Sequence, residues 1–340
     1  MRTTYFFILT LALSSCLSET PADKSFIHDV TSGPKPWTFE EFEAEEEDFT
    51  FGIIADLTGG EREGIFNVAV AQVNRLEPTF VLSVGDLIEG GSLDTTVLKN
   101  EWESFDARAA NFTVPFFYLG GNHDLSNPVM QDFWHRRFGP TYYHFVYNNV
   151  LFLMLDSEDF EYEKMMEIHE ARTEAMKIIY GEVEGDFEKT KYFNMPERRT
   201  GAMTEVQMNY FLDVLQKYQE VRWTFVFMHK PLYTRDDLKG LGRLEEALTT
   251  RSYTVINGHE HSFSHQIRNG QDYIMLGTTG GFQSDEDDKA FDHFTLVRMA
   301  KKPVITHLRM DGVLDETGSI PLGGDTLSFQ ASKPKILVNE

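Results

Sequence analysis

Short apolar runs alternate with helically spaced apolar positions in the first half of the chain. The runs at 49–55, 79–84 and 114–119 each end in polar residues, and apolar side chains at helical spacing follow the first run over 65–73. Strands that alternate with helices predict βαβ units and therefore a parallel sheet. In such sheets, ligands gather outside the carboxyl ends of the strands.

The second half of the chain continues this pattern and adds antiparallel pairs. Residues 142–155 predict a hairpin that turns at Asn148 and Asn149, and Thr204 begins a helix with a capping-box spacing to Gln207. Apolar runs and strict alternation predict further strands at 222–228, 253–256, 262–278 and 293–310. The whole pattern predicts an α/β fold.

Composition narrows the class of protein. The 340 residues are 41% hydrophobic and 25% charged, which is typical of one large α/β domain or two smaller ones. Lys and Arg number 31 against 54 Asp and Glu, so the net charge is −23, which disfavours binding to duplex nucleic acid. Because the chain has one cysteine, it forms no internal disulfide, and any metal must be held by His, Asp, Asn or Glu.

The N-terminus predicts export. Arg2 precedes an apolar run at 5–13 that is shorter than the roughly 20 residues of a membrane-spanning helix, so we expect a signal peptide over 1–15. The end of this run, Leu-Ser-Ser-Cys16, resembles the bacterial lipobox, in which a lipid is joined to the cysteine. The resemblance implies an exported cell-envelope lipoprotein that is attached to the membrane through Cys16. Leu17 favours the outer membrane or its periplasmic face, and a plain signal peptide with an incidental cysteine is the alternative.

The domain boundaries follow from shifts in composition. Residues 16–48 are polar, contain three prolines and become strongly acidic, which predicts a tether with little structure of its own. Within this tether, Trp37 and Phe39 are expected to pack against the folded domain. One folded domain is expected over 49–310, followed by a weakly patterned tail at 311–340. An acidic, helical insertion at about 157–203 is either a lid over a site or a solvated subdomain without a functional role.

Residues that suit metal chemistry follow the predicted strands. Two divalent cations about 3.5 to 4 Å apart need hard oxygen and imidazole ligands, with one carboxylate shared between them, to clamp a phosphoryl group. Each short motif alone is more often turn chemistry, but together they predict a metal site. In chain order these motifs are Asp56, Gly85-Asp86, Gly121-Asn122-His123-Asp124, His229 and Gly258-His259-Glu260-His261.

This series resembles the calcineurin-like metallophosphoesterase superfamily, whose motifs are D-x-H, G-D, G-N-H-D/E, a lone His and G-H-x-H. The resemblance implies two packed mixed β-sheets flanked by helices, a four-layer sandwich. It also implies two divalent or trivalent metal ions, which would be Mn, Fe, Mg or Zn. The activity that it implies is hydrolysis of phosphomonoesters or phosphodiesters by a metal-bound hydroxide.

The resemblance assigns a role to each matching residue. His123 matches the histidine that contacts the substrate phosphate and stabilises or protonates the leaving oxygen. Asp124 matches the carboxylate that orients this imidazole. The family's ligands of the first metal are matched by Asp56, Asp86 and His261, and Asp86 bridges the two metals. The remaining ligands of the second metal are matched by Asn122, His229 and His259.

Three positions need separate hypotheses. The chain has Thr58 where the family usually has the histidine of D-x-H, and a hydroxyl is a poor substitute for imidazole at a transition metal. Glu89 is a candidate oxygen ligand of the first metal, because related purple acid phosphatases carry a ligand three residues after the shared aspartate; a solvated loop carboxylate is the alternative. Arg62 is a candidate phosphate-binding residue, or else an arginine that faces solvent.

Two functions therefore stay open. The leading one is an exported, lipid-anchored enzyme, a metallophosphoesterase, whose negative charge favours a small phosphate ester over a long polyanion. The alternative is a non-catalytic or mononuclear binding protein on the same fold, which Thr58 favours. Metal content separates the two, since the enzyme needs two ions per chain. No oligomeric state is predicted.

Overall fold

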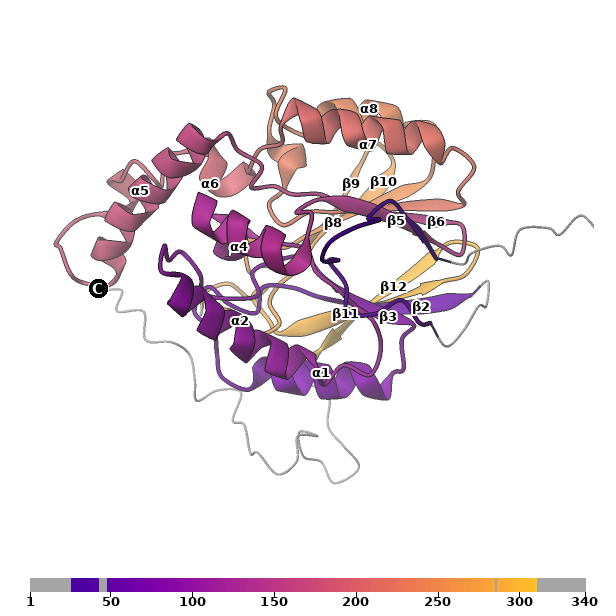
Figure 1. Cartoon of the computed structure of the whole chain (residues 1–340), viewed down its shortest axis with the longest axis horizontal. Helices are drawn as coiled ribbons and strands as arrows, with labels where there is room; N and C mark the ends of the chain where they lie inside the picture. The colour runs from indigo at the N-terminus through magenta and orange to yellow at the C-terminus, as the bar shows by residue number, and fades with distance from the viewer. Residues whose placement is uncertain (1–25, 43–47, 285, 311–340) are drawn as a thin grey trace, which may run out of the picture.

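Two β-sheets pack face to face in the computed structural model, which describes residues 26–42, 48–284 and 286–310 (Figure 1). The larger sheet has seven strands, and parallel pairing joins β6 to β7, β7 to β8 and β8 to β10. Across the sheet the order is β1 (Phe26–His28), β5 (Tyr143–Tyr147), β6 (Val150–Met154), β7 (Trp223–Phe227), β8 (Tyr253–Asn257), β10 (Gln271–Met275) and β9 (Ser264–Arg268).

The smaller sheet has five strands. Its central strands β2, β3 and β4 are parallel, and β11 joins them as an antiparallel neighbour of β2. The order is β12 (Pro303–Arg309), β11 (His293–Met299), β2 (Phe49–Ile54), β3 (Phe80–Ser83) and β4 (Phe116–Phe117). Both sheets are mixed, as expected, and the predicted hairpin at Asn148 and Asn149 joins β5 to β6.

Helices cover the outer face of each sheet (Figure 1). On the five-stranded sheet these are α1 (Ile65–Arg75) and α2 (Thr95–Ala109), and on the seven-stranded sheet α7 (Glu205–Lys217) and α8 (Gly242–Leu248). The remaining helices, at one end of the sandwich, are α3 (Asn122–Leu125), α4 (Pro128–Phe138), α5 (Tyr162–Ile179) and α6 (Pro196–Thr200), with the short 3-10 turns η1 (Phe187–Lys189) and η2 (Leu232–Thr234). The predicted α/β class and its layers of helix, sheet, sheet and helix are confirmed.

Aromatic side chains fill the space between the two sheets. The ring of Phe51 lies 5.3 Å from that of Phe152 and 5.2 Å from that of Phe225, in both cases edge to face across the sandwich. Such pairs contribute roughly 0.5–1.5 kcal/mol each beyond the burial of their area. Tyr143 and Phe145 belong to the same core. This packing fixes the ends of the strands, from which the site is built.

The described part of the expected tether is integrated into the domain, which corrects the prediction that it has little structure. Residues 26–28 form the edge strand β1, which pairs with β5, and Trp37 is buried against Phe117. Phe39 remains 37% exposed. Cys16, the signal peptide and the tail lie outside the described residues. Within the part of the chain that the structure describes, no helix is long and apolar enough to cross a membrane.

The insertion is fixed to the domain at its base. Its two ends meet, since the amide of Ala202 donates to the carbonyl of Ser157 at 2.9 Å. The ammonium of Lys230 is buried between the carboxylate of Glu158, at 2.8 Å, and the carbonyl of Glu197, at 3.1 Å. Removing one partner of a buried pair typically costs about 3–5 kcal/mol. The insertion is therefore held in a defined position beside the end of β7.

Candidate metal centre

The predicted site residues converge at one edge of the sandwich. Each follows the carboxyl end of a strand, as expected for parallel strands of an α/β sheet. The five-stranded sheet supplies Asp56 after β2, Asp86 after β3 and the segment 122–124 after β4; the seven-stranded sheet supplies His229 after β7 and both His259 and His261 after β8.

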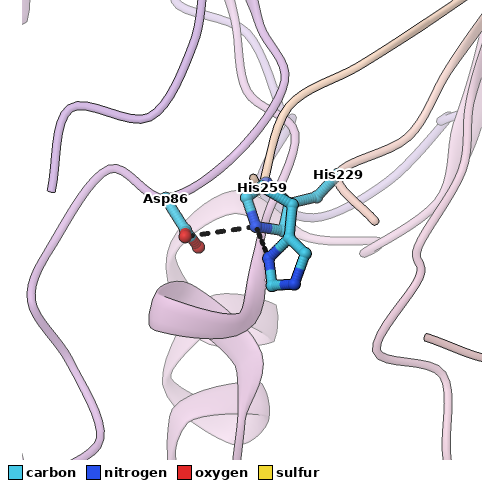
Figure 2. Close-up of side chains that lie close together, drawn as sticks. All are labelled: Asp86, His229 and His259. Atoms are coloured by element: carbon cyan, nitrogen blue, oxygen red, sulfur yellow. Dashed lines mark hydrogen bonds and ion pairs between the residues drawn. The ribbon is translucent and has the colours of Figure 1, made fainter. Parts of the chain in front are cut away.

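The second cluster consists of Asp86, Asn122, His229 and His259. One ligand atom from each of Asp86, His229 and His259 lies within 4.8 Å of the other two (Figure 2). The Nε2 atom of His229 lies 3.1 Å from Asp86 Oδ2, 3.2 Å from His259 Nδ1 and 3.2 Å from Asn122 Oδ1. Four potential ligand atoms thus face one point.

The first cluster consists of Asp56, Asp86 and His261, whose ligand atoms also lie within 4.8 Å of one another. His261 Nε2 is 3.5 Å from Asp56 Oδ1. The other oxygen of Asp56 is buried and has no hydrogen-bond partner among the described residues, which is costly for a carboxylate unless a cation is bound. Asp86 belongs to both clusters, in the position of a bridging ligand.

Backbone carbonyls orient all three histidines of the clusters. In each imidazole, one ring nitrogen lies at hydrogen-bond distance from a carbonyl oxygen, so its N–H is directed away from the cluster. The other nitrogen then presents its lone pair to the cluster, which is the arrangement that metal-bound histidines have. The pairs are His229 Nδ1 with Val84 O at 2.9 Å, His259 Nε2 with Arg198 O at 2.8 Å and His261 Nδ1 with Phe282 O at 2.6 Å.

Backbone strain gathers at the clusters. Eight non-glycine residues in the described chain have positive φ, and four of them are cluster residues. The left-handed conformation costs roughly 1–2 kcal/mol for such residues, and it persists where the surrounding structure imposes it, often at functional sites. The four are Asp56 (φ 47°), Asp86 (φ 58°), His259 (φ 83°) and His261 (φ 54°).

The electrostatics of the clusters favour a positive charge. Burial by itself lowers the pKa of His229, but the adjacent Asp86 carboxylate outweighs this effect and raises the pKa to about 9. Burial raises the pKa of Asp56 well above its usual value, and the charge of Asp86 adds to this. Carboxylate, amide and imidazole ligands of this kind suit Mn, Fe or Zn. The donor atoms, their orientation and the unpartnered Asp56 oxygen therefore fit two metal ions that share Asp86.

The calcineurin-like phosphoesterase family matches residues 49–263, which is more than half of the chain. The chain belongs to this family. No curated protein sequence matches it. These findings confirm the family that the motifs predicted.

Solved structures share the fold of this chain. A dimetal phosphatase from Danio rerio is similar with a TM-score of 0.52 and 18% identity, over 77% of this chain and 96% of that one. A purple acid phosphatase from yellow lupin (Lupinus luteus) seeds is similar with a TM-score of 0.50 and 13% identity, over 77% of this chain and 51% of that one. The structure of PhoD is similar with a TM-score of 0.52 and 10% identity, over 79% of this chain and 70% of that one. At these identities the likeness shows a common fold.

His123 lies beside the two clusters. Its backbone amide donates to Asp86 Oδ1 at 2.8 Å, and its Nδ1 lies 2.6 Å from the carbonyl oxygen of Glu89. Burial lowers the pKa of His123; Asp86 opposes this effect and the positive charge of Arg172 increases it. With Nδ1 on the carbonyl, Nε2 is the atom that can exchange a proton with a bound molecule.

Asp124 has a different role from the one expected. Its carboxylate accepts hydrogen bonds from the amides of Asp86 and Gly121, both at 2.8 Å, and from those of Leu87 and Ile88, at 2.9 and 3.2 Å. Because Glu89 rather than Asp124 contacts the imidazole of His123, Asp124 does not orient that ring. It instead fixes the two loops that carry Asp86 and His123.

The structure gives both Glu89 and Thr58 hydrogen-bond partners. The carboxylate of Glu89 accepts from the amides of Gly60 and Glu61 at 3.0 and 2.8 Å, and among the described residues neither cluster includes it. The hydroxyl of Thr58 donates to the carbonyl of Ile88 at 2.7 Å. Glu89 lines the cavity beside the clusters, with its other carboxylate oxygen 3.9 Å from His123 Nδ1, and its role as an oxygen ligand of the first metal stays a prediction.

Arg62 is a structural residue rather than a phosphate ligand. It is only 2% exposed, forms an ion pair with Asp292 and donates from Nε to the carbonyl of Gly281 at 3.0 Å. Phe282, whose carbonyl orients His261, is the next residue along the chain. The hypothesis that Arg62 grips substrate is therefore wrong, and its side chain instead holds the loop that positions His261.

A cavity of about 640 Å³ opens over the clusters. Asp86, Asn122 and His123 line it together with residues of the insertion, so the insertion forms a wall of the site, and its action as a lid stays a prediction. The residues of this wall belong to none of the motifs in the sequence. Their helical spacing in α5 was a usable signal. They include Arg172, Met176, Ile179, Tyr180, Phe187, Tyr192, Arg198 and Arg199.

Proposed function

We propose that this protein is a metal-dependent enzyme that hydrolyses phosphomonoesters or phosphodiesters at a dinuclear centre. The observation that carries the proposal is the orientation of three histidines, each with one nitrogen on a backbone carbonyl and the other in a cluster that contains Asp86. Metal-bound histidines have this arrangement, because the hydrogen bond at one nitrogen fixes the ring with the lone pair of the other nitrogen directed at the metal.

The residues divide into those that hold metal and one that moves a proton. Asp56, Asp86 and His261 would hold one ion, and the second cluster would hold the other. Two bound divalent ions supply Lewis-acid stabilisation of the phosphoryl group and lower the pKa of water. His123 keeps one proton at Nδ1 on the Glu89 carbonyl; in its imidazolium form it gives the Nε2 proton to the leaving oxygen as water attacks phosphorus and the bond to that oxygen breaks, and the proton that the water loses restores the imidazolium.

Hydrolysis of two chromogenic esters tests this proposal. The purified protein, loaded with Mn²⁺, is assayed with p-nitrophenyl phosphate and bis(p-nitrophenyl) phosphate before and after chelation. We expect turnover that chelation abolishes and Mn²⁺ restores, and that His123→Ala lowers by about 10²-fold or more. His265→Ala, on the exposed strand β9, is the control that keeps activity. Absence of turnover of both esters with two ions bound would contradict the proposal.

A mononuclear or non-catalytic binding protein is the second candidate. The position of Thr58 favours it, because its hydroxyl faces the Ile88 carbonyl and leaves the first cluster with three ligand residues. Metal analysis of the protein after dialysis against Mn²⁺ separates the candidates. Two ions per chain support the enzyme, and one or fewer without turnover supports the binding protein.

We also propose that the protein is exported and attached to the cell envelope through a lipid on Cys16. The support is the short apolar run and the cysteine that follows it. Labelling with a radioactive fatty acid in a bacterial host tests this. Cys16→Ser should abolish the label and release the protein from the membrane fraction, and a labelled Cys16→Ser protein would contradict it.

A further inference from the structure

The cavity over the clusters is lined partly by the predicted metal ligands and partly by the insertion, which forms a wall of its own. We propose that this wall selects the substrate: Arg172 binds the phosphoryl group of a dianionic phosphomonoester, and the apolar residues beside it bind an aromatic leaving group. This inference rests on the proposed hydrolase function and makes its substrate class specific.

Arg172 is placed to bind an anion. It is half-buried on α5 and reaches the turn at Gly91, where an added Cβ would come within 2.3 Å of its Nη1 atom. It forms no hydrogen bond or ion pair within 26–42, 48–284 and 286–310, although the chain has 54 acidic residues. Arginines elsewhere find carboxylates, as Arg235 does with Asp237. A guanidinium left open beside a phosphoryl site binds phosphate oxygens in a bidentate way.

A second guanidinium of the insertion is held near the same cavity. Arg198 packs over the rings of Phe193 and Phe187, at 4.7 and 5.7 Å from their centroids. It forms no ion pair among the described residues. Two open positive charges favour the doubly charged phosphate of a monoester over the singly charged phosphate of a diester, since the Coulomb attraction grows with charge.

The rest of the wall is apolar and aromatic. The side chains at positions 172, 176 and 179 of α5 and at its C-cap, 180, have the spacing of one helical face, and the segment after α5 adds two rings. Tyr180 is 67% exposed, so its ring is accessible to a molecule in the cavity. Flat apolar groups pack well on such rings. The residues are Met176, Ile179, Tyr180, Phe187 and Tyr192.

Three esters separate the two parts of the inference. Benzyl phosphate and methyl phosphate release alcohols of similar acidity and differ in the aromatic ring, and benzyl methyl phosphate is the matching diester. With the Mn²⁺-loaded protein we expect kcat/KM for benzyl phosphate to exceed that for each of the others by about tenfold or more. Arg172→Gln should lower kcat/KM for benzyl phosphate by about tenfold and for the diester by less than about threefold.

Two further variants complete the test: one removes a ring from the apolar wall, and the other is a control for the loss of a positive charge. Tyr180→Ala should lower kcat/KM for benzyl phosphate by about tenfold and leave that for methyl phosphate unchanged, because only the ring contact is lost. Arg136→Gln removes the same charge from the exposed face of α4, where it pairs with Asp132, and should leave all three values unchanged. Equal effects of Arg172→Gln and Arg136→Gln would overturn the inference.

Binding of benzylphosphonate, which is not hydrolysed, keeps this test separate from the proposed function. Calorimetry with the Mn²⁺-loaded protein should show binding that Arg172→Gln and Tyr180→Ala each weaken by about tenfold. If the protein binds the phosphonate in this way but hydrolyses nothing, the inference about the wall is supported and the hydrolase proposal is contradicted. If it hydrolyses esters without regard to the ring or to Arg172, the hydrolase stands and this inference fails.

Discussion

The two clusters share Asp86 but differ in how completely they are built. The second cluster brings Asn122, His229 and His259 to one point, with both imidazoles fixed by carbonyl oxygens. The first has Asp56 and His261, and no further candidate joins them within the described ranges. Affinity for a divalent ion rises with the number of oriented ligands. The comparison teaches that one shared carboxylate can serve two unequal sites.

The difference originates in the loop after β2. Thr58 occupies the position of the family histidine, and its hydroxyl donates a hydrogen bond to the carbonyl of Ile88. Gly59 follows, and a Cβ there would come within 3.1 Å of the His261 ring and 3.5 Å of the His123 ring. The loop is thus packed closely against the site without contributing a side-chain ligand. We therefore expect the second cluster to bind metal more tightly than the first.

Removing one histidine from each cluster should have the largest effect. His229→Ala and His261→Ala should each lower kcat/KM by about 10³-fold, which corresponds to about 4 kcal/mol of transition-state stabilisation. Their metal contents should differ, because His261→Ala keeps the tighter ion whereas His229→Ala loses it. Metal analysis beside the assays measures this. Two ions per chain in the His229→Ala protein would contradict the prediction that the second cluster is the tighter metal site.

Asp124→Asn tests what holds the shared ligand in place. Since Asp124 accepts four amide hydrogen bonds around Asp86, the substitution should lower the free energy of unfolding of the metal-free protein by about 2–3 kcal/mol. It should weaken both metal sites alike. Urea denaturation and metal titration give these values. Unchanged stability together with a shifted pH–rate profile would instead restore the role of orienting His123.

Titration of the metal-free protein with Mn²⁺ should show two steps at least about tenfold apart, or about 1.4 kcal/mol. Because His229 has a pKa of about 9 in the metal-free protein, a proton occupies the tighter site below that pH and must leave when metal binds. The affinity of the tighter step should therefore rise about tenfold per pH unit from pH 7 to 9. Calorimetry in buffers of different ionisation enthalpy counts the proton. An affinity that does not change with pH would count against the assignment.

Thr58→Val should have the smallest effect. The variant loses one buried hydrogen bond to Ile88, which costs about 1 kcal/mol of stability, and should leave both metal affinities unchanged. Thermal denaturation and the same metal titration check the two statements. A weaker first site in the variant would show that the hydroxyl is a ligand after all.

The sequence was sufficient for the fold and for the assembly of the clusters. Buried strands such as 79–84 could be recognised locally, and parallel strands bring the residues after their carboxyl ends together whatever the intervening chain does. Asp56, Asp86 and His229 are therefore close in space although they are far apart in sequence. The edge strand β1 was missed because three residues carry no periodicity and their partner β5 is distant in sequence.

The orientation of single side chains was less predictable. Asp124 is adjacent to His123 in sequence, but it lies three residues after Gly121 at the start of α3, where an aspartate caps backbone amides. Arg62 follows the loop after β2 in sequence, which predicts that it faces the site, yet its partner Asp292 comes from a distant loop. Arg172 was missed because only the packing of the insertion, fixed at its base by Lys230, places α5 over the clusters.

The most direct test of the central claim is anomalous diffraction from crystals of the Mn²⁺-loaded protein. The account predicts two peaks about 3.5–4 Å apart on either side of the Asp86 carboxylate. The peak between His229 and His259 should be the stronger at limiting metal, and the one between Asp56 and His261 should grow as Mn²⁺ is raised. A single peak at saturating Mn²⁺, or peaks that do not contact Asp86, would contradict it.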